Sequence, residues 1–438
     1  MSERQNRIGA VVGASMIGTM IEWFDFFIYG FASALVFNQL FFPSFSPLTG
    51  TLLAFSTYAL GFLARPLGGV IFGHFGDRVG RKKLLMISLI IMGLSTVGIG
   101  LLPTYDQIGP MAPILLISLR LAQGFAVGGE WGGAVLMVAE TAPPARRAFW
   151  TCWPQVGAPA GNLLAAGVFA ISAAALSDAE FLRWGWRIPF LSSIVLVAVG
   201  YWLRRAVAES HLFEREATST GVERFPVLEV LRRNPRALLE GAGLRFGENL
   251  AYYVAATFSI TYFTQIRGGS KELVLDAVLL GSALECITMP MFAALADRIG
   301  RRPVYLFGAL TMALSFLWFF GLLDSGSERA VSLAIAAAMI AHGAMYAPQG
   351  AFIAELFPTR LRYSGASIAY QLSSVAAGSL APMVSLALYQ TWNSSVPVVV
   401  YVVCGCLISA LAALLAPETR GIALAEAGGP RNGGPPPV

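Results

Sequence analysis

The chain has 438 residues, of which 56% are hydrophobic and 13% are charged, and its formal net charge is +5. A soluble globular domain is about half apolar and about a quarter charged, so this composition excludes a water-soluble enzyme and predicts an integral membrane protein. The positive charge does not indicate nucleic-acid binding, because the basic residues lie where membrane topology places them.

Twelve apolar stretches follow one another along the chain, each close to or somewhat longer than the roughly 20 residues that a helix needs to cross a membrane. Their hydrophobicity is continuous and does not alternate, which predicts helices and excludes membrane strands. The first stretch lacks a cleavage site and contains Glu22 and Asp25, so it is expected to be a span and not a signal peptide. The predicted spans are residues 9–37, 49–72, 83–103, 113–140, 149–175, 186–206, 237–265, 273–296, 303–323, 329–355, 362–390 and 396–416.

The Lys and Arg residues are distributed unevenly between the loops. If the N-terminus is cytoplasmic, 22 of the 30 lie on the cytoplasmic side and five on the other side. The remaining three, Arg65, Arg120 and Arg245, lie inside spans. The positive-inside rule therefore predicts that both termini are cytoplasmic.

The chain also repeats itself. The sequence GHFGDRVGRK at 73–82 follows the second span, and AALADRIGRR at 293–302 follows the eighth. This spacing predicts two parallel halves of six spans each. The predicted division is an N-terminal bundle at 1–206, a cytoplasmic linker at 207–236, a C-terminal bundle at 237–421 and a disordered cytoplasmic tail at 422–438.

These repeated loops and the PETRG segment at 417–421 resemble the major facilitator superfamily of secondary transporters. Within it, the segments 22–26, 64–69 and 120–131 resemble the metabolite:proton symporter family, and 72–82 and 184–190 are most similar to its shikimate permeases. The resemblance implies an all-α fold with twelve transmembrane helices in two six-helix bundles. It also implies a monomer in a bacterial cytoplasmic membrane that uses the proton as coupling ion and needs no cofactor.

Asp25 and Arg120 are the first candidates for proton coupling. At 1.5 Å per residue, Asp25 lies ~20 Å from the cytoplasmic end of span one and Arg120 lies ~10 Å from the outer end of span four, so the two depths nearly coincide. A carboxylate beside an arginine releases its proton, whereas an isolated buried carboxylate binds one. A pair that forms and breaks would therefore carry a proton; the alternative is a permanent salt bridge.

Three further ionisable side chains lie inside the predicted membrane segments of the N-terminal half. Arg65 and Glu130 match in depth near the cytoplasmic mouth, which favours a gate or a structural lock over a substrate site. Glu22 lies one turn before Asp25 on the same helix face. It is either a second proton acceptor or a partner for a neighbouring helix.

The superfamily resemblance implies a central cavity lined by spans 1, 4, 7 and 10. Arginine suits a substrate carboxylate, because its guanidinium donates two parallel hydrogen bonds. Amide and phenol groups suit hydroxyls, although core packing of the tyrosines and histidine, and helix bridging by the glutamines, are alternatives. The candidate substrate-binding residues are Arg245, Glu248, Asn249, Tyr252, Tyr253, Gln123, Gln155, His342, Tyr346 and Gln349.

The repeated loops carry candidate gating residues. The first loop is not a phosphate-binding loop, because it lacks the Lys-Ser/Thr ending and follows no strand. Its aspartate is expected to contact a helix N-terminus or an arginine of the opposite half, while its basic residues also fix topology. The gating candidates in the two loops are Asp77, Arg78, Arg81, Asp297, Arg298 and Arg301.

The residues distinguish three classes of function. The motifs favour a proton-coupled symporter that imports a small organic acid, such as shikimate or another mono- or dicarboxylate. The alternative is a carrier of a zwitterionic osmolyte such as proline or betaine. The resemblance implies that osmosensing carriers of this kind have a long C-terminal coiled coil, whereas the tail here has no heptads, which disfavours this alternative. An enzyme or receptor is disfavoured, because the four cysteines and three histidines show no metal or catalytic spacing.

Overall fold

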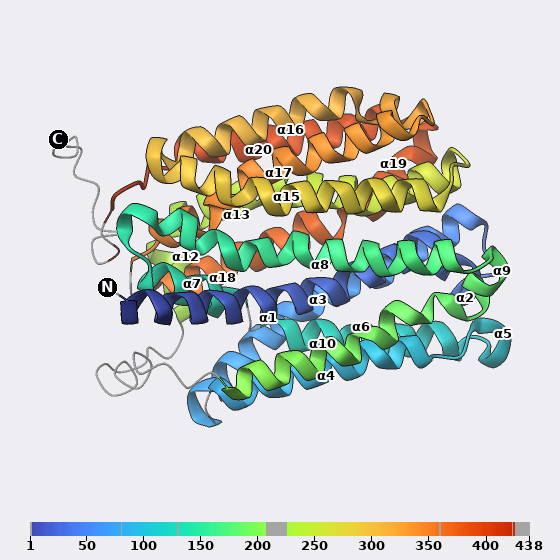
Figure 1. The fold of residues 1–438 in the computed structure, drawn as a ribbon, viewed down its shortest axis with the longest axis horizontal. Coiled ribbons are helices and arrows are strands. Elements are labelled where there is room, and N and C mark those ends of the chain that lie inside the picture. The colour runs from blue at the N-terminus through green and yellow to red at the C-terminus, as the bar shows by residue number, and fades with distance from the viewer. Residues whose placement is uncertain are drawn as a thin grey trace.

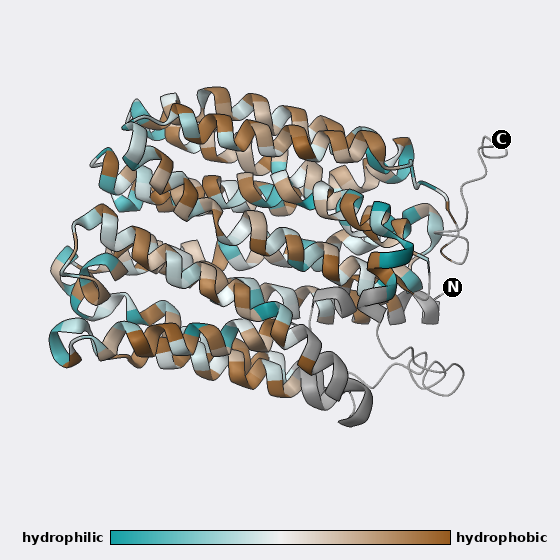
Figure 2. Cartoon of the chain, turned by 180° about the vertical axis from the view of Figure 1, so that it is seen from behind, coloured by the Kyte–Doolittle hydropathy of each residue, from teal (hydrophilic) through white to brown (hydrophobic). Residues whose placement is uncertain are grey.

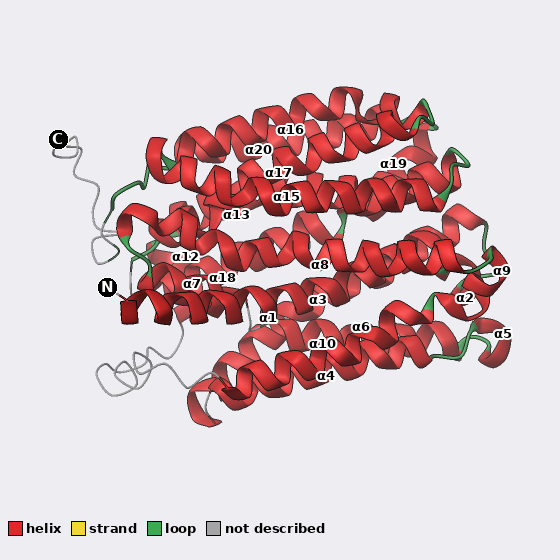
Figure 3. Ribbon diagram, in the orientation of Figure 1, coloured by secondary structure: helices red, strands yellow, loops and turns green. Residues whose placement is uncertain are grey.

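The computed structural model describes residues 2–79, 81–128, 131–206, 226–358, 361–422 and 424. Within these ranges the side chains of 2–7, 10, 69–70, 72–79, 81–85, 131–134, 203–206 and 226–228 are not described. Every regular element in the described ranges is a helix, joined by short loops (Figure 3). The all-helical fold predicted from hydropathy is therefore confirmed.

Six long helical segments make up the N-terminal half. Short helices and turns connect them: α2 (Phe37–Phe41), α5 (Tyr105–Ile108), η1 (Pro144–Arg146), α9 (Asp178–Glu180) and η2 (Phe181–Gly185). The long segments are α1 (Ser2–Leu35), α3 (Pro47–Val79), α4 (Arg81–Leu101), α6 (Met111–Val127) followed by α7 (Trp131–Thr141), α8 (Arg147–Ala175) and α10 (Arg187–Ala206).

The C-terminal half begins after the short helix α12 (Pro226–Arg233) and repeats the same number of long segments. Two of them contain π-helical turns. The segments are α13 (Pro235–Tyr253) with η3 (Val254–Phe258), α14 (Ser259–Thr261) and η4 (Tyr262–Ile266); α15 (Lys271–Ile299); α16 (Arg301–Asp324); α17 (Glu328–Leu356); α18 (Arg362–Ser373) with η6 (Ser374–Ser379) and α19 (Ala381–Trp392); and α20 (Val396–Leu415).

Each of the twelve predicted spans thus coincides with one long helical segment. By length and hydropathy alone, eight described helices are able to cross a membrane, or nine if the bent pair at α9–α10 is one span. The shorter apolar stretches at Met86–Leu101 and Met111–Val127 fall below that length. Helix α13 carries four charged residues, which lowers its hydropathy but brings ionisable groups into the bundle.

The long helices run side by side, and α1 begins and α20 ends at the same end of the bundle, here called the terminal end (Figure 1). The short helices α5 and α9 lie at the other end, here called the opposite end. Helix α8 of the N-terminal half packs on α15 and α17 of the C-terminal half, and α3 packs on α19. These contacts form the interface between the halves.

Hydrophobic residues cover the length of the helices, and hydrophilic residues gather toward the ends (Figure 2). Large apolar side chains such as Leu94, Ile194 and Leu411 are exposed, whereas the charged side chains of Asp25, Arg120 and others are buried. This distribution is the reverse of a soluble protein and matches a helix bundle whose solvent is lipid.

Glycines allow the closest helix crossings. A Cβ atom on Gly124 of α6 would lie 1.8 Å from the carbonyl oxygen of Gly61 on α3, and one on Gly247 of α13 would lie 2.1 Å from the carbonyl oxygen of Gly405 on α20. Only glycine permits such backbone approach between membrane helices. These crossings hold α6 and α13, which carry the two buried arginines Arg120 and Arg245, at fixed depth.

Candidate functional site

A chain of buried polar groups crosses three helices of the N-terminal half. Thr96 of α4 donates its hydroxyl hydrogen to Oδ2 of Asp25 on α1 over 2.9 Å, and Gln123 of α6 donates to the Thr96 hydroxyl over 2.8 Å. Arg120 of α6 donates to the Gln123 carbonyl. All four side chains are fully buried. We call Asp25, Thr96, Gln123 and Arg120 the N-cluster.

The guanidinium of Arg120 lies over aromatic rings and not against a carboxylate. Its central carbon is 4.3 Å from the ring centroid of Phe26, 4.4 Å from that of Tyr29 and 4.8 Å from that of Tyr58. Arg65 of α3 lies 3.9 Å from the centroid of the same Phe26 ring. The negative faces of the rings attract the two buried cations.

Asp25 and Arg120 therefore stand at the two ends of one hydrogen-bonded chain, and no ion pair joins them directly in this conformation. Oδ1 of Asp25 and both Nε and Nη2 of Arg120 have no hydrogen-bond partner among the described residues. A buried polar atom left unpaired costs about 1–3 kcal/mol, so these atoms are available to a proton, a substrate or each other. Glu22 lies one turn earlier on α1 and is buried; its role stays a prediction.

A second polar cluster occupies the C-terminal half. Nη1 of Arg245 lies 3.2 Å from Oε2 of Glu248 on the same helix and donates to Oε1 of Gln349 on α17 over 2.9 Å. Gln349 in turn donates to Oε2 of Glu248 over 3.2 Å. The Arg245 guanidinium carbon lies 3.6 Å from the ring centroid of Tyr370. This guanidinium already binds a carboxylate.

His342 of α17 extends this cluster. Its Nε2 lies 2.6 Å from Oε1 of Glu248, and its Nδ1 contacts Oε1 of Glu285 on α15. The centroid of its ring is 4.2 Å from that of Tyr252 and 5.1 Å from that of Tyr346. We call Arg245, Glu248, Glu285, His342 and Gln349 the C-cluster, and all five side chains are buried.

Aromatic rings fill the space between the two clusters. The ring centroid of Tyr253 on α13 lies 6.0 Å from that of Tyr58 and 6.4 Å from that of Trp23, both in the other half. The centroid of Tyr252 lies 5.7 Å from that of Phe27 on α1. These tyrosines thus lie at the interface between the halves.

Two predicted substrate-binding amides bond to other parts of the protein. Asn249 donates to the Ser374 hydroxyl at the π-helical turn η6 over 3.4 Å. Gln155 of α8 donates to the backbone carbonyl of Tyr346 on α17 and so bridges the two halves. In this conformation both amides connect helices, and their substrate role stays a prediction.

The second repeated loop closes the terminal end. Oδ1 and Oδ2 of Asp297 accept hydrogen bonds from the backbone N–H groups of Ala148 and Phe149 over 3.0 and 2.9 Å. These groups lie at the start of α8 in the opposite half, where the helix dipole attracts an anion. Arg301 pairs with the same carboxylate over 2.8 Å. Arg298 is exposed beside it.

A buried ion pair strengthens this closure. Nη1 of Arg147 at the start of α8 lies 2.6 Å from Oε1 of Glu355 at the end of α17. Arg301 lies 3.3 Å from the same glutamate oxygen, and the Thr419 hydroxyl donates to Oε2 over 2.6 Å. We call Asp297, Arg301, Arg147 and Glu355 the latch. It connects the two halves through charged groups that sequence inspection did not assign, except for Asp297 and Arg301.

Contacts between the halves also close the opposite end. Thr51 of α3 donates to the side-chain oxygen of Gln265 in η4 over 2.9 Å, and Gln265 donates to the backbone carbonyl of Ala34. Lys271 at the start of α15 pairs with Asp178 of α9. Since both ends are closed, the N-cluster and the C-cluster are sealed from water in this conformation.

Several predicted gating residues cannot be placed. Glu130 lies outside the described residues, so its pairing with Arg65 stays a prediction. The backbone around Asp77, Arg78 and Arg81 is helical, but the side chains of these three residues lie outside the described part of the structure.

Thr96 and Glu285 are the two cluster members that are not among the predicted site residues. A single threonine in an apolar helix is common, so the sequence around Thr96 does not mark it as a site residue. Glu285 is detectable as an ionisable residue in the middle of a predicted span, and such residues are expensive unless they have partners. What the sequence lacks is the identity of that partner, His342, which is 57 positions away.

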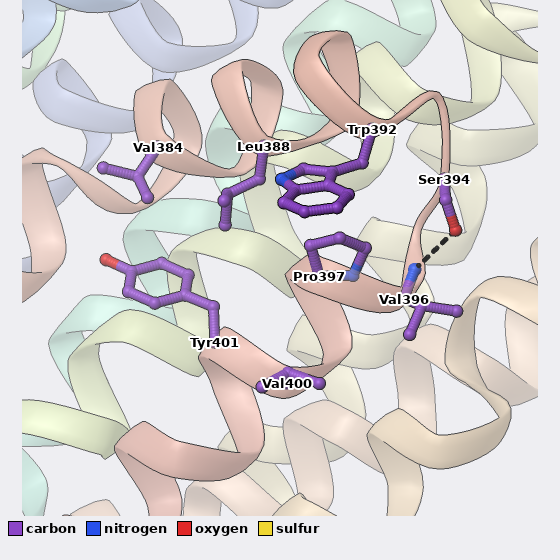
Figure 4. Close-up of a pocket in the computed structure, with 8 residues that line it drawn as sticks. All are labelled: Val384, Leu388, Trp392, Ser394, Val396, Pro397, Val400 and Tyr401. Carbon is purple, nitrogen blue, oxygen red and sulfur yellow. Dashed lines mark hydrogen bonds between the residues drawn. The ribbon is translucent and has the colours of Figure 1, made fainter.

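An apolar pocket lies apart from both clusters, where α19 turns into α20 (Figure 4). No charged side chain lines it, so it does not offer the groups that an organic acid requires. The hydrogen bond drawn there, from the Val396 N–H to the Ser394 hydroxyl over 3.2 Å, only closes the turn. The lining residues are Val384, Leu388, Trp392, Ser394, Val396, Pro397, Val400 and Tyr401.

Two six-helix bundles with buried charged groups along a common interface, closed at both ends, define a secondary transporter of the major facilitator type. The chain belongs to the family described as "Sugar (and other) transporter", whose model matches residues 10–223 and 204–428. The predicted superfamily is thereby confirmed. The chain is a multi-pass membrane transporter and not an enzyme.

Curated relatives agree with this family. The chain is 46% identical to the shikimate transporter of Escherichia coli over 413 residues, covering 93% of this chain and 94% of that one. It is 39% identical to the inner membrane metabolite transport protein YhjE of the same species, with 95% of each chain covered. It is also 34% identical to the proline/betaine transporter of Escherichia coli, covering 85% of this chain and 76% of that protein.

Solved structures show the same fold. The crystal structure of a D-xylose-proton symporter superposes with a TM-score of 0.72 at 18% identity, covering 95% of this chain and 100% of that chain. A partially occluded, inward-open structure of the xylose transporter XylE from Escherichia coli superposes with a TM-score of 0.70 at 20% identity, covering 95% and 99%. The predicted twelve-helix fold in two bundles is confirmed.

Proposed function

We propose that this protein is a proton-coupled symporter that imports a small organic acid, such as shikimate or another mono- or dicarboxylate, by alternating access. The observation that carries this proposal is the pair of buried clusters, one in each half, each with a buried guanidinium and a buried carboxylate. Buried charges at membrane depth are costly and mark substrate and proton pathways. The 46% identity to a shikimate transporter supports the substrate class.

In this proposal the N-cluster carries the coupling proton. Asp25 binds it when its carboxylate is separated from Arg120 and releases it when the two approach, because a neighbouring cation favours the ionised carboxylate. Thr96 and Gln123 already connect the two groups. Glu22, one turn away, is a further proton acceptor at the same site in the N-terminal half.

The substrate carboxylate is assigned to Arg245, whose guanidinium has the planar geometry for two parallel hydrogen bonds. Hydroxyl groups of the substrate are assigned to other polar residues of the two halves. These are Asn249, Tyr252, Tyr253, His342, Tyr346 and Gln349 from the C-terminal half, and Gln123 and Gln155 from the N-terminal half. Glu248 then has to leave Arg245 before the substrate binds.

Alternating access would proceed by rocking of the bundles at 1–206 and 237–421 about the central site, with 207–236 as the linker. The latch opens and closes the terminal end, which the excess of Lys and Arg assigns to the cytoplasm of a bacterial cell. Both termini and the segment 422–438 are then cytoplasmic, and one monomer forms the whole pathway. The coupling ion is the proton and no cofactor takes part.

A zwitterionic osmolyte such as proline or betaine is the second candidate substrate. The rings of Tyr252 and Tyr346 pack on the His342 ring, which contacts the Glu248 carboxylate. Aromatic faces near an anion suit a quaternary ammonium group. The 34% identity to proline/betaine transporters supports keeping this candidate.

Uptake into proteoliposomes of the purified full chain tests both candidates. Labelled shikimate is offered under an imposed inward proton gradient, with and without an uncoupler, and with competition by a panel of organic acids, proline and betaine. Uncoupler-sensitive accumulation that only organic acids block supports the proposal. No accumulation of shikimate, with uncoupler-sensitive accumulation of labelled proline or betaine, would move the assignment to the osmolyte. Uptake that the uncoupler does not reduce would show that transport is not coupled to protons.

A further inference from the structure

Three titratable side chains from three helices meet inside the C-cluster, and sequence inspection assigned no role to one of them. Glu248 of α13 and Glu285 of α15 lie on opposite sides of the His342 ring of α17, with Nε2 2.6 Å from Glu248 Oε1 and Nδ1 in contact with Glu285 Oε1. Their side chains are 3%, 0% and 3% exposed. We call these three residues the triad.

The geometry fixes how many protons the triad holds. A neutral imidazole has one N–H and one nitrogen lone pair, so it can donate to only one of two ionised carboxylates. The lone pair would then face the other carboxylate without a hydrogen between them. Both contacts are hydrogen bonds only if a second proton is present, either on the ring as an imidazolium or on one carboxyl group as an acid.

Charge balance agrees with this count. With the second proton, the triad carries one net negative charge, which the adjacent Arg245 neutralises through Glu248. Without it, the buried cluster carries an uncompensated negative charge, which a sealed, low-dielectric site disfavours. The conformation closed at both ends is therefore the one that retains the proton.

Among the described residues, the other groups that face the triad from the packed helices are uncharged polar or aromatic side chains, apart from Arg245. Gln349 of α17 donates to Glu248 over 3.2 Å, and the ring of Tyr252 stacks on His342. Tyr346 lies on the same ring, Tyr305 of α16 and Cys286 of α15 lie close to the two carboxylates, and Tyr370 of α18 covers Arg245.

We propose that Glu248, His342 and Glu285 form a second proton-binding site, which makes Arg245 available to the substrate. This deepens the proposed function and rests on it for the identity of the substrate. A substrate carboxylate that takes Arg245 displaces Glu248 and leaves the negative charge of the triad without its cation. Binding of a further proton by the triad restores the charge balance, so substrate and proton bind together. Proton and substrate then stabilise the same closed state, and both leave when it opens to the cytoplasm.

The test compares wild type with Glu285→Gln, which keeps the size and polarity of the side chain but cannot bind a proton. The control is Glu272→Gln, the same exchange in the first turn of the same helix, where the side chain is 43% exposed. Proteoliposomes report substrate accumulation under a proton gradient and substrate exchange without one. We expect Glu285→Gln to lower accumulation at least ~10-fold while exchange stays measurable and loses its dependence on pH, and we expect the control to match wild type.

A second measurement needs no substrate and so separates this proposal from the proposed function. Proton uptake by the purified full chain is followed in weakly buffered detergent solution from alkaline to acidic pH. Between alkaline pH and about pH 6, where exposed carboxyl groups stay ionised, wild type and Glu272→Gln should take up one proton more per chain than Glu285→Gln, and His342→Gln should lose the same proton. Equal uptake by Glu285→Gln and wild type, or accumulation by Glu285→Gln with an unchanged pH profile, would overturn the second site. Failure of wild type to accumulate any panel compound would count against the proposed function alone.

Discussion

Each cluster contains an arginine and a carboxylate, but the two pairs are arranged differently. In the N-cluster, Asp25 and Arg120 are separated by Thr96 and Gln123, and the guanidinium lies on aromatic rings. In the C-cluster, Arg245 binds Glu248 directly at 3.2 Å, and Gln349 contacts both. One ion pair is open and the other is closed in a single conformation of the transporter.

Because of this difference, we expect the two halves to have different roles in transport. The N-cluster leaves Oδ1 of Asp25 and two nitrogens of Arg120 without hydrogen bonds among the described residues, so it gains free energy from any new partner. In the C-cluster, Glu248 contacts Arg245, Gln349 and His342, so a ligand that binds Arg245 must replace an existing contact. There, Oε2 of Glu285 is the carboxylate oxygen without a hydrogen-bond partner among the described residues. Coupling between such sites is possible because a change in one half alters the interface that both share.

Replacing Asp25 with asparagine should have the largest effect. Asparagine keeps the hydrogen bond to Thr96 but binds no proton, so accumulation should fall to equal concentrations on both sides while exchange stays measurable. Uptake of shikimate by proteoliposomes with and without a proton gradient measures this. Asp276→Asn, at an exposed position of α15, is the matched control. Accumulation by Asp25→Asn with wild-type pH dependence would show that the N-cluster is not the coupling group.

Changes at Arg245 should come next. Arg245→Ala leaves Glu248 buried without its cation, which is expected to cost about 3–5 kcal/mol of stability. Arg245→Lys keeps the charge but loses the planar contact with Tyr370 and the parallel hydrogen bonds, so KM should rise by about 10- to 100-fold. Thermal unfolding in detergent and uptake kinetics separate the two effects. If Arg245→Lys left KM unchanged, the substrate carboxylate would bind elsewhere, and Arg120 would be the next arginine to test.

Changes in the latch, which contains Asp297 and Arg301 of the second repeated loop, should have the next largest effect. Asp297→Asn removes the ion pair with Arg301 and one of the two acceptors for the start of α8. Hydrogen bonds to charged groups contribute about 1.5–3 kcal/mol, so the open state at the terminal end should become roughly 10-fold more populated. Alkylation of Cys152, buried one turn inside α8, should accelerate accordingly. In Arg298→Gln, a change at an exposed neighbouring position, Cys152 should be alkylated at the wild-type rate. Equal alkylation rates in Asp297→Asn and Arg298→Gln would contradict the assigned role of the latch.

Thr96→Val should have the smallest effect. The substitution keeps the shape of the side chain but breaks the chain between Asp25 and Gln123, leaving two buried groups unpaired at about 1–3 kcal/mol. We expect transport to persist at a rate lowered several-fold, with a shifted pH profile, because Arg120 loses its link to Asp25. The control is Ser95→Ala, since the one hydrogen bond of the Ser95 hydroxyl to the described part of the chain is to the Ile91 carbonyl of its own helix, over 2.7 Å. Identical pH profiles for the two variants would show that the chain through Thr96 is structural.

The sequence alone determined the fold. Continuous apolar stretches, the uneven distribution of Lys and Arg, and the repeat at 73–82 and 293–302 gave twelve spans in two halves, because hydrocarbon permits little else than helices of a fixed length. The sequence also identified most members of both clusters, since an ionisable residue inside a span is too costly to occur without a function or a partner.

Only the tertiary structure decided which of these residues meet. Helical rise placed Asp25 and Arg120 at one depth, but depth says nothing of helix rotation, and the structure inserts Thr96 and Gln123 between them. Glu285 gained a partner because α15 and α17 pack side by side, and Asp297 reached the start of α8 across the interface between the halves. Such pairings depend on how twelve helices are rotated and packed together, which is a property of all the contacts and not of any one segment.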